Sequence, residues 1–224
     1  MKNIIVIGAG GHASVIIEII EAMINNGSQI NIYGLLDDSN EKTEFMGYKI
    51  LGNVENIKLY ANENTEFVIA IGNNTVRKTI AMEFKDLKYF TAIHPTAIIS
   101  NRVDINEGTV IMPRVIINSN TKIGKHSIIN SGSIIEHDSK IESFTHISPG
   151  VTLCGGVKVG EESHIGANST VIQYKNIGAN TVVGAGSTVI NDIDSDVVVV
   201  GSPAKIKRGN RNEQKNIPCF PSHG

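Results

Sequence analysis

The chain has 224 residues, of which 41% are hydrophobic, and its formal net charge at pH 7 is -2. This length allows two modest domains or one large one, and the nearly balanced charge gives no broad cationic surface for nucleic acid or an anionic membrane. The two cysteines have neither CxxC nor framework spacing, and no segment approaches eighteen uninterrupted apolar residues. We therefore expect a cytoplasmic protein with no disulfide framework, no membrane insertion and no nucleic acid partner.

Residues 1–90 alternate short apolar runs with helical patterns. The runs "NIIVIG", "INIYGLLDD" and "EFVIAIGNN" have the composition of strands, while "ASVIIEIIEAMI" and the stretch after Asn74 have helical spacing. This order predicts a Rossmann-like α/β domain with a small parallel sheet. Ligands of such sheets bind at the carboxyl ends of the strands, so we expect the crevice near Gly8–His12, Asp37, Asp38 and Gly72–Asn74.

The first turn, "GAGGHA", formally satisfies the GxGxxA pattern of dinucleotide-binding folds, and Asp37 follows at a distance suited to a ribose. A complete dinucleotide fold needs two mononucleotide halves, and only about ninety residues precede the next pattern. We therefore expect one nucleotide, with its phosphate on the N–H groups of Gly10 and Gly11 at a helix N-terminus and His12 pointing into the crevice. A tight turn without a ligand is the alternative.

Residues 91–204 follow a six-residue repeat. Every sixth position from Ile93 to Val189 is Ile, Leu or Val, and most of these are followed four residues later by a small or β-branched residue, with Lys175 the clear exception. A helix or an alternating strand does not produce this period, whereas a coil of three short strands joined by turns does, with one aliphatic side chain inward per hexad. The repeat predicts a β-solenoid with a stacked aliphatic core.

The hexads "IGKHSI", "IESFTH", "VGEESH", "IGANST" and "VGAGST" resemble those of the hexapeptide-repeat acyltransferases. The resemblance spans about a hundred residues and implies an all-β left-handed parallel β-helix. A β-solenoid that serves only as a scaffold is the alternative.

His137, between Glu136 and Asp138, is the candidate catalytic residue. Residues eighteen apart occupy the same place on neighbouring coils, roughly 4.8 Å apart, so His137 lies between Ser119 and the bare backbone of Gly155. An adjacent carboxylate that fixes the imidazole tautomer suits a general base. Either acid qualifies, and we favour Asp138 because a turn there breaks strand alternation.

Further along the coil, His146 has His164 stacked above it. A metal site formed by His137, His146 and His164 lacks tight ligand spacing within one face, so we expect no metal.

Taken together, the two halves resemble the bacterial sugar acetyltransferases that include the sialic acid O-acetyltransferases and the nucleotide 4-amino-sugar N-acetyltransferases. The motifs that carry the resemblance are "GAGGHA", "LLDD", "IAIGNN", "IIEHDSKIESFTHISPG" and "VGSPAK". It implies a homotrimer, with the nucleotide sugar on the N-terminal half and acetyl-CoA as cosubstrate between adjacent β-helices. It assigns the general base to His137 and its supporting acid to Asp138, acetyl-CoA contacts to His146, Ala167 and Ala185, and the nucleotide sugar to Gly10, Gly11, His12, Asp37, Asp38 and Gly72.

We therefore predict an acetyl-CoA-dependent N-acetyltransferase acting on a nucleotide-linked amino sugar in bacterial surface glycan or protein glycosylation pathways. The resemblance implies that the acceptor is a UDP-4-amino-4,6-dideoxy sugar. The N–H of Gly155 would stabilise the oxyanion. The alternatives are O-acetylation of a sialic acid or similar sugar, and a nucleotide-binding scaffold without catalysis. The sequence specifies neither base nor sugar, and residues 205–224 are expected to form a basic C-terminal tail.

Overall fold

The computed structural model describes residues 1–39 and 43–207, and it begins with an α/β half. Its elements are β1 (Lys2–Ile7), α1 (Gly11–Asn25), β2 (Ile30–Leu36), β3 (Glu44–Phe45), β4 (Tyr48–Gly52), the 3-10 helix η1 (Val54–Tyr60), β5 (Thr65–Ile69) and α2 (Asn74–Glu83). They form a five-stranded sheet in the order β3-β4-β2-β1-β5, parallel except for β3. The predicted strands and helices are confirmed.

The hairpin β3–β4 and the helix η1 were absent from the sequence prediction. The hairpin turns at Met46 and Gly47, both with positive φ, and none of the residues of β3 or β4 is fully buried. The hairpin buries no residue fully and η1 buries only Ile57, so neither leaves a periodic hydrophobic pattern in the sequence.

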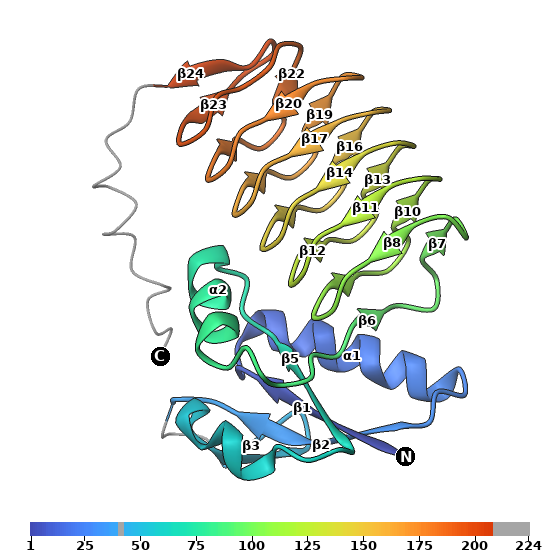
Figure 1. Cartoon of the computed structure of the whole chain (residues 1–224), viewed down its shortest axis with the longest axis vertical. Helices are drawn as coiled ribbons and strands as arrows, with labels where there is room; N and C mark the ends of the chain where they lie inside the picture. The colour runs from blue at the N-terminus through green and yellow to red at the C-terminus, as the bar shows by residue number, and fades with distance from the viewer. Residues whose placement is uncertain (40–42, 208–224) are drawn as a thin grey trace.

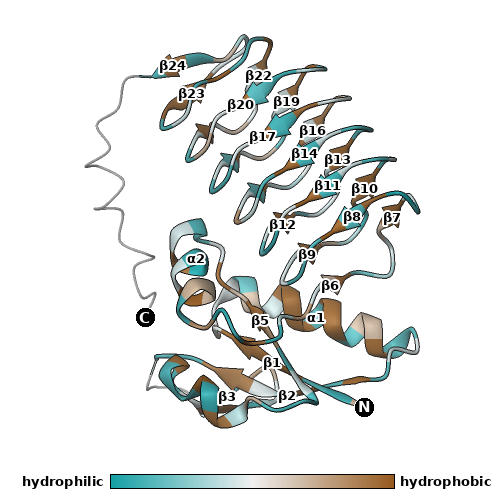
Figure 2. Cartoon of the chain, viewed as in Figure 1, coloured by the Kyte–Doolittle hydropathy of each residue, from teal (hydrophilic) through white to brown (hydrophobic). Residues whose placement is uncertain are grey.

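Helix α1 joins the two halves into one core. Its residues Ala13, Ile16, Ile17, Ile19 and Ile20 are buried, and the helix contacts both the sheet and the first strand of the coil. In Figure 1 it lies between the α/β sheet and the β-helix, and Figure 2 colours it largely hydrophobic. The buried residues of α1 and of the coil belong to a single hydrophobic cluster.

The coil is a left-handed parallel β-helix of three sheets, as predicted. The isoleucine face contains β7 (Ile98–Ile99), β10 (Ile116–Ile117), β13 (Ile134–Ile135), β16 (Thr152–Leu153), β19 (Thr170–Val171) and β22 (Thr188–Val189). The lysine face contains β8 (Asp104–Ile105), β11 (Lys122–Ile123), β14 (Lys140–Ile141), β17 (Lys158–Val159) and β20 (Asn176–Ile177). The histidine face contains β6 (Ala92–Ile93), β9 (Val110–Ile111), β12 (Ile128–Ile129), β15 (His146–Ile147), β18 (His164–Ile165), β21 (Val182–Val183), β23 (Val198–Val200) and β24 (Lys205–Lys207).

The hexad explains how the coil is held together. The second residue of nearly every two-residue strand is the repeated aliphatic, and from Ile111 to Val189 these side chains are buried. The small positions matter too, because hydroxyls such as those of Ser127 and Ser163 donate to the carbonyls of Glu142 and Gly178, fifteen residues along the chain. These bonds satisfy buried polar groups at the corners and connect successive coils.

The first residue of each strand points outward and gives each face its character. The lysine face exposes Lys122, Lys140 and Lys158 in one row. The isoleucine face carries Ile98, which is 66% exposed, and the half-buried Ile116 and Ile134. On the histidine face, the outward residues of β6, β9 and β12 are buried, whereas those of β15 and β18 are His146 and His164. The outward residues therefore determine what each face can contact.

The far end of the β-helix differs from the predicted tail. Lys205–Lys207, assigned above to the tail, form β24, which pairs antiparallel with β23, while residues 208–224 lie outside the described part of the chain. Within the described ranges, the structure contains no helix long and apolar enough to cross a membrane.

Candidate active site

His137 and Asp138 lie at the corner between the isoleucine and lysine faces, in the turn from β13 to β14. The Nδ1 atom of His137 lies 2.8 Å from Oδ2 of Asp138, and φ of Asp138 is +60°. The hydrogen bond from His137, with a further one from Asn120, holds the pKa of Asp138 below its usual value. Nδ1 is thereby occupied, and Nε2 of His137 is the nitrogen left to accept a proton.

Glu136, the other acid considered for this role, makes a different contact. Its Oε2 accepts a hydrogen bond of 2.8 Å from the side-chain amide of Asn118, one coil below. The turn at Asp138 brings that carboxylate, and not Glu136, to the imidazole. The contact expected of Asp138 is therefore present, while its catalytic role stays a prediction.

The backbone of Gly155 lies against the His137 ring. A Cβ atom at Gly155 would be 2.8 Å from Cε1 and 2.9 Å from Nε2 of that ring, so only glycine fits without moving the imidazole. Within the described residues, no hydrogen bond uses the Gly155 N–H. The next glycine, Gly156, is covered from the coil above by the ring of Tyr174, a residue that is 70% exposed and that sequence reasoning passed over.

A row of three histidines lies on the opposite side of the coil. The His146 and His164 rings stack with centroids 4.7 Å apart, and the His12 ring centroid lies 6.5 Å from that of His146. Nε2 of His146 is 3.1 Å from the Asn130 amide nitrogen, and Nε2 of His164 is 2.9 Å from the Ser148 hydroxyl. Two buried atoms of this row, His12 Nε2 and His146 Nδ1, have no hydrogen-bond partner within the described residues.

These histidines are neutral at pH 7. Burial, reinforced by the charge of Arg77, lowers the pKa of His12 to about 4. Burial, followed by the repulsion that a protonated His164 would exert, lowers the pKa of His146 to about 3, although the nearby Gly72 carbonyl opposes the shift. A neutral imidazole with a free buried nitrogen can hydrogen-bond a polar substrate group, because it donates at one nitrogen and accepts at the other.

The predicted crevice lies at the carboxyl ends of β1, β2 and β5. A Cβ built at Gly10, Gly11 or Gly72 meets no atom within 4 Å, so these positions face open space. In the described part of the chain, no hydrogen bond uses the N–H groups of Gly10, Gly11 or His12 at the start of α1. Such N–H groups at a helix N-terminus suit a phosphate.

Asp37 and Asp38 shape this crevice by binding its backbone. The Asp37 carboxylate accepts hydrogen bonds from the N–H of Ala9, at 2.7 Å, and of Ser39, at 2.9 Å. Asp38 accepts from the N–H of Val54 at the start of η1. Asp37 also borders a hollow lined in part by Lys49 and Asn53. Asp37 therefore fixes the first glycine turn beside an open hollow.

Ala167 and Ala185 lie on neighbouring coils at the corner between the histidine and isoleucine faces. The Gly186 N–H donates to the Ala167 carbonyl, and Ala185 is exposed. Their predicted contact with acetyl-CoA stays a prediction. No group of three or more metal-ligating side chains suited to a metal ion occurs among the described residues.

One chain does not bring all of the predicted site residues together. His12, Gly72 and His146 meet on the histidine face. His137 and Asp138 occupy the corner between the other two faces, and in a three-sided prism that corner lies opposite the histidine face. The crevice and the candidate base of one chain are thus on different sides of the β-helix.

The fold defines a hexapeptide-repeat transferase with an N-terminal α/β domain. Residues 3–84 match the family model of the PglD N-terminal domain, and residues 138–173 match the bacterial transferase hexapeptide model. The chain is 41% identical over 113 residues to the UDP-N-acetylbacillosamine N-acetyltransferase of Bacillus subtilis. That match covers 48% of this chain and spans about half, 50%, of the curated relative.

Solved structures match over nearly the whole chain. PerB from Caulobacter crescentus, in complex with CoA and GDP-perosamine, is 33% identical with a TM-score of 0.85 and covers 93% of this chain and 98% of its own. The acetyltransferase domain of PglB from Neisseria gonorrhoeae, in complex with acetyl coenzyme A, is 31% identical with a TM-score of 0.86 and covers 92% and 99%. The chain belongs to this family of hexapeptide-repeat sugar acetyltransferases.

Proposed function

We propose that the protein transfers the acetyl group of acetyl-CoA to the amine of a nucleotide-linked amino sugar. The observation that carries this proposal is the contact between His137 and Asp138 beside the bare backbone of Gly155. The names of the relatives support the substrate class: the Bacillus subtilis protein is a UDP-N-acetylbacillosamine N-acetyltransferase, and PerB was solved with CoA and GDP-perosamine.

The chemistry requires a base and an oxyanion donor. The amine nitrogen attacks the thioester carbonyl, a C–N bond forms as the C–S bond breaks, and coenzyme A leaves as a thiolate. Nε2 of His137 takes the proton of the developing ammonium, while Asp138 holds Nδ1. The N–H of Gly155 stabilises the negative charge on the carbonyl oxygen.

We infer that the complete site lies between copies of the chain in a cyclic homotrimer. The lysine face is charged and exposed, and α1 contacts the first strand of the histidine face, which leaves the isoleucine face for burial against another copy. The two edges of that face are the His137 corner and the corner of Ala167 and Ala185. A head-to-tail ring through this face brings the His137 corner of one copy to the alanine corner and histidine face of the next.

The N-terminal crevice accounts for the nucleotide. The free N–H groups at the start of α1 suit a diphosphate, and the free nitrogens of His12 and His146 suit polar groups of the sugar. An amine attacks a thioester with only modest activation, which an exposed His137–Asp138 pair supplies, whereas a hydroxyl demands fuller proton removal. This favours N-acetylation over O-acetylation. Placement in the cytoplasm stays a prediction.

Thiol release from acetyl-CoA tests the function. The acceptors are UDP- and GDP-linked 4-amino-4,6-dideoxy sugars, the matching 4-hydroxy sugars and free sialic acid. We expect release with a nucleotide amino sugar and almost none with the corresponding hydroxyl sugar. Equal rates, or a preference for free sialic acid, would overturn the assignment, and no release with any acceptor would favour the scaffold alternative.

Two variants test the crevice and the assembly. Gly11→Leu projects a side chain into the open space proposed for the nucleotide. UDP or GDP should then compete less well with the nucleotide-sugar acceptor, while the KM for acetyl-CoA stays unchanged. Ile116→Glu places a charge on the isoleucine face. Sedimentation should then show no trimer, and thiol-release assays should show no activity. The matched change Lys122→Glu on the lysine face should do neither. A fully active monomer would refute the site between copies.

A further inference from the structure

Arg77 is buried at the junction of the two halves. The residue lies on α2, is 1% exposed, and has the largest side chain among the fully buried residues. Burial lowers its pKa to about 9, so the guanidinium is still charged at neutral pH. A hydrophobic side chain of similar volume would avoid the desolvation of a cation, so stability alone gives a poor reason for an arginine here.

The guanidinium is bound entirely by oxygens that carry no formal charge. Nε donates to the His126 carbonyl at 2.7 Å, Nη1 to the carbonyls of Ile71 at 2.9 Å and Gly72 at 3.1 Å, and Nη2 to Asn74 Oδ1 at 2.7 Å and the Phe144 carbonyl at 3.0 Å. This fixed fork uses the planar geometry that distinguishes arginine from lysine.

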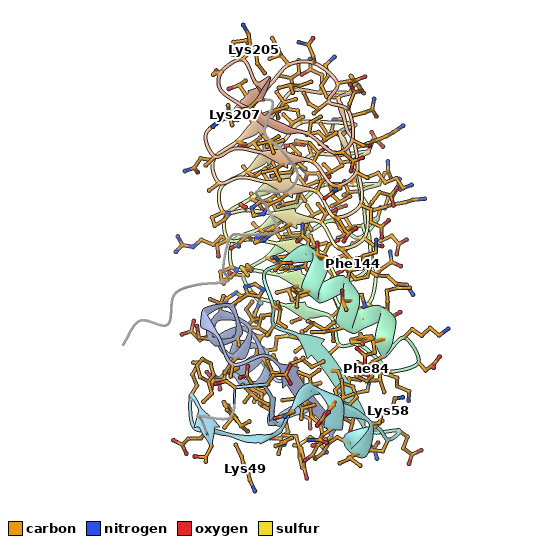
Figure 3. The ribbon with its side chains drawn as sticks, turned by 90° about the vertical axis from the view of Figure 1, so that its left-hand side faces the viewer. Lys49, Lys58, Phe84, Phe144, Lys205 and Lys207 are labelled. Carbon is orange, nitrogen blue, oxygen red and sulfur yellow. The ribbon has the colours of Figure 1, made fainter. Side chains whose placement is uncertain are left out.

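Its partners on the coil form one column. His126, Phe144 and Glu162 lie eighteen residues apart, at the corner between the lysine and histidine faces. Arg77 binds the first two, and the amide of Asn74 extends the contact by donating to the carbonyls of Glu162, at 2.9 Å, and Ser163, at 3.2 Å. In Figure 3, Phe144 lies beside α2, where the helix meets the coil. The start of α2 is therefore fastened to three successive coils.

Both ends of this fork adjoin candidate site residues. On the α/β side it binds Ile71 and Gly72, at the carboxyl end of β5, where the crevice opens. On the coil side Phe144 precedes His146 by two residues, and Ser163 directly precedes His164. Movement of one side relative to the other would change the distance between the crevice and the histidine face.

We propose that Arg77, with Asn74, is a positioning residue that sets the nucleotide crevice over the histidine face of its own subunit. This inference rests on the proposed function, because the bound sugar must reach the acetyl group. Arg77 affects how the nucleotide crevice and the histidine face are aligned. Neither the binding of the nucleotide nor the binding of CoA depends on it. Misplacement by about 1 Å is enough to cost about a hundredfold in rate.

The test compares Arg77→Lys, which keeps the charge and loses the fork, with Lys78→Met on the same helix. Lys78 forms partly exposed ion pairs with Glu161 and Glu162 in the same column, and such pairs contribute little. For Arg77→Lys we expect kcat to fall about a hundredfold, with CoA and UDP or GDP binding by calorimetry within about threefold of wild type. Lys78→Met should match wild type in all three measurements.

Two readouts keep the test decisive. Hydrogen exchange should accelerate in Arg77→Lys at the N–H groups of Ala70 and Val76, which flank the loop at residues 71–74 and are bonded to the Ile7 carbonyl and to Asn73 Oδ1. It should stay unchanged in Lys78→Met, whether or not the acceptor has been identified. A folded Arg77→Lys trimer with wild-type kcat, or unchanged exchange at Ala70 and Val76, overturns the positioning role. Wild-type protein that acetylates no amino sugar, with exchange altered as expected, would refute the proposed function and leave the positioning of this loop supported. Asn74→Ala should reproduce the effect on exchange in milder form.

Discussion

In the β-helix, residues eighteen apart stack in register, so His137 faces Gly155 and His146 faces His164 by the same rule. In the α/β half, the two candidate site carboxylates depend on their own local hydrogen bonds and not on a repeated contact. Asp37, for example, holds the N–H groups of Ala9 and Ser39, which lie on different loops. The coil thus positions side chains by periodicity, and the α/β half positions them through individual hydrogen bonds.

Along the coil, the residues that stabilise the fold differ from those available for function. Inward positions form the core, whereas outward and corner positions are free to carry chemistry, as His137 and the lysine row show. In the α/β half the Asp37 carboxylate both holds the first glycine turn and borders an open hollow, so the two roles are harder to separate. The following variants test this contrast, from the largest expected effect to the smallest.

Adjacent residues of β14 give the sharpest contrast within the coil. Ile141 is 1% exposed and points inward, whereas Lys140 is exposed and pairs with Glu142. We expect Ile141→Ala to lower the free energy of unfolding by about 2–5 kcal/mol, because it leaves a cavity in a stacked core. Lys140→Ala should change it by no more than about 0.5 kcal/mol in chemical denaturation. Similar losses for both variants would contradict the inward and outward division.

His137→Ala should separate function from stability at a corner. We expect kcat to fall by about a hundredfold or more, a typical contribution of a general base. The half-exposed side chain contributes little to packing, so the unfolding midpoint and CoA binding should stay close to wild type. Near-normal turnover would move the base elsewhere, with His146 as the next candidate.

The buried histidines predict a loss of stability in acid. His126 is 4% exposed, and its ring stacks on that of Phe144 with the ring centroids 5.3 Å apart. Burial lowers the pKa of His126 to about 4. The unfolded chain binds protons near pH 6.5, so stability is full above that pH and decreases as pH falls towards about 4. Each such histidine contributes a slope of about 1.4 kcal/mol per pH unit in this window.

His126→Phe isolates that contribution at the junction of the halves. Phe144 already occupies the same corner one coil above, also with positive φ, so an aromatic ring is compatible with the backbone. The slope of unfolding free energy between pH 6.5 and about 4 should decrease by about 1.4 kcal/mol per pH unit. An unchanged slope would mean that His126 is protonated in the folded chain.

Asp37→Ala tests whether the halves bind their ligands independently. Removing the carboxylate frees the N–H groups of Ala9 and Ser39 and loosens the first glycine turn. Two charge-assisted bonds are lost, so we expect about a tenfold rise in the KM for the nucleotide sugar. The KM for acetyl-CoA should not change, since its predicted contacts are on the coil. A parallel rise in both constants would indicate that the halves respond together.

The coil was largely predictable because its core follows a single period. The hexads predict that His137 lies beside Gly155 and His146 beside His164, and both contacts are present in the structure. In the α/β half the strands of "NIIVIG" and "INIYGLLDD" were also predictable from their apolar runs. The short hairpin near Met46 was not, because it buries little surface.

Residues that connect the halves left no signal in the sequence. Arg77 looks like an ordinary polar residue of an amphipathic helix, and only the fold brings it to the carbonyls of His126 and Phe144. The meeting of His12 with His146 likewise depends on how α1 lies on the coil. Periodicity predicts contacts within the repeat, while contacts across the junction depend on tertiary packing.

Asp138→Asn is expected to have the smallest effect on catalysis. The side chains of His137 and Asp138 are 54% and 56% exposed, so water screens the pair and weakens its interaction. We therefore expect kcat to fall by less than about tenfold. The amide oxygen of asparagine still accepts a hydrogen bond from the Nδ1–H group and keeps the imidazole oriented, which further limits the loss. Glu136→Gln is the matched control and should have no effect on kcat, because Glu136 bonds Asn118 and not the imidazole. A larger loss in Glu136→Gln than in Asp138→Asn would transfer the supporting role to Glu136, and would mean that the turn at Asp138 does not select the acid that acts on His137.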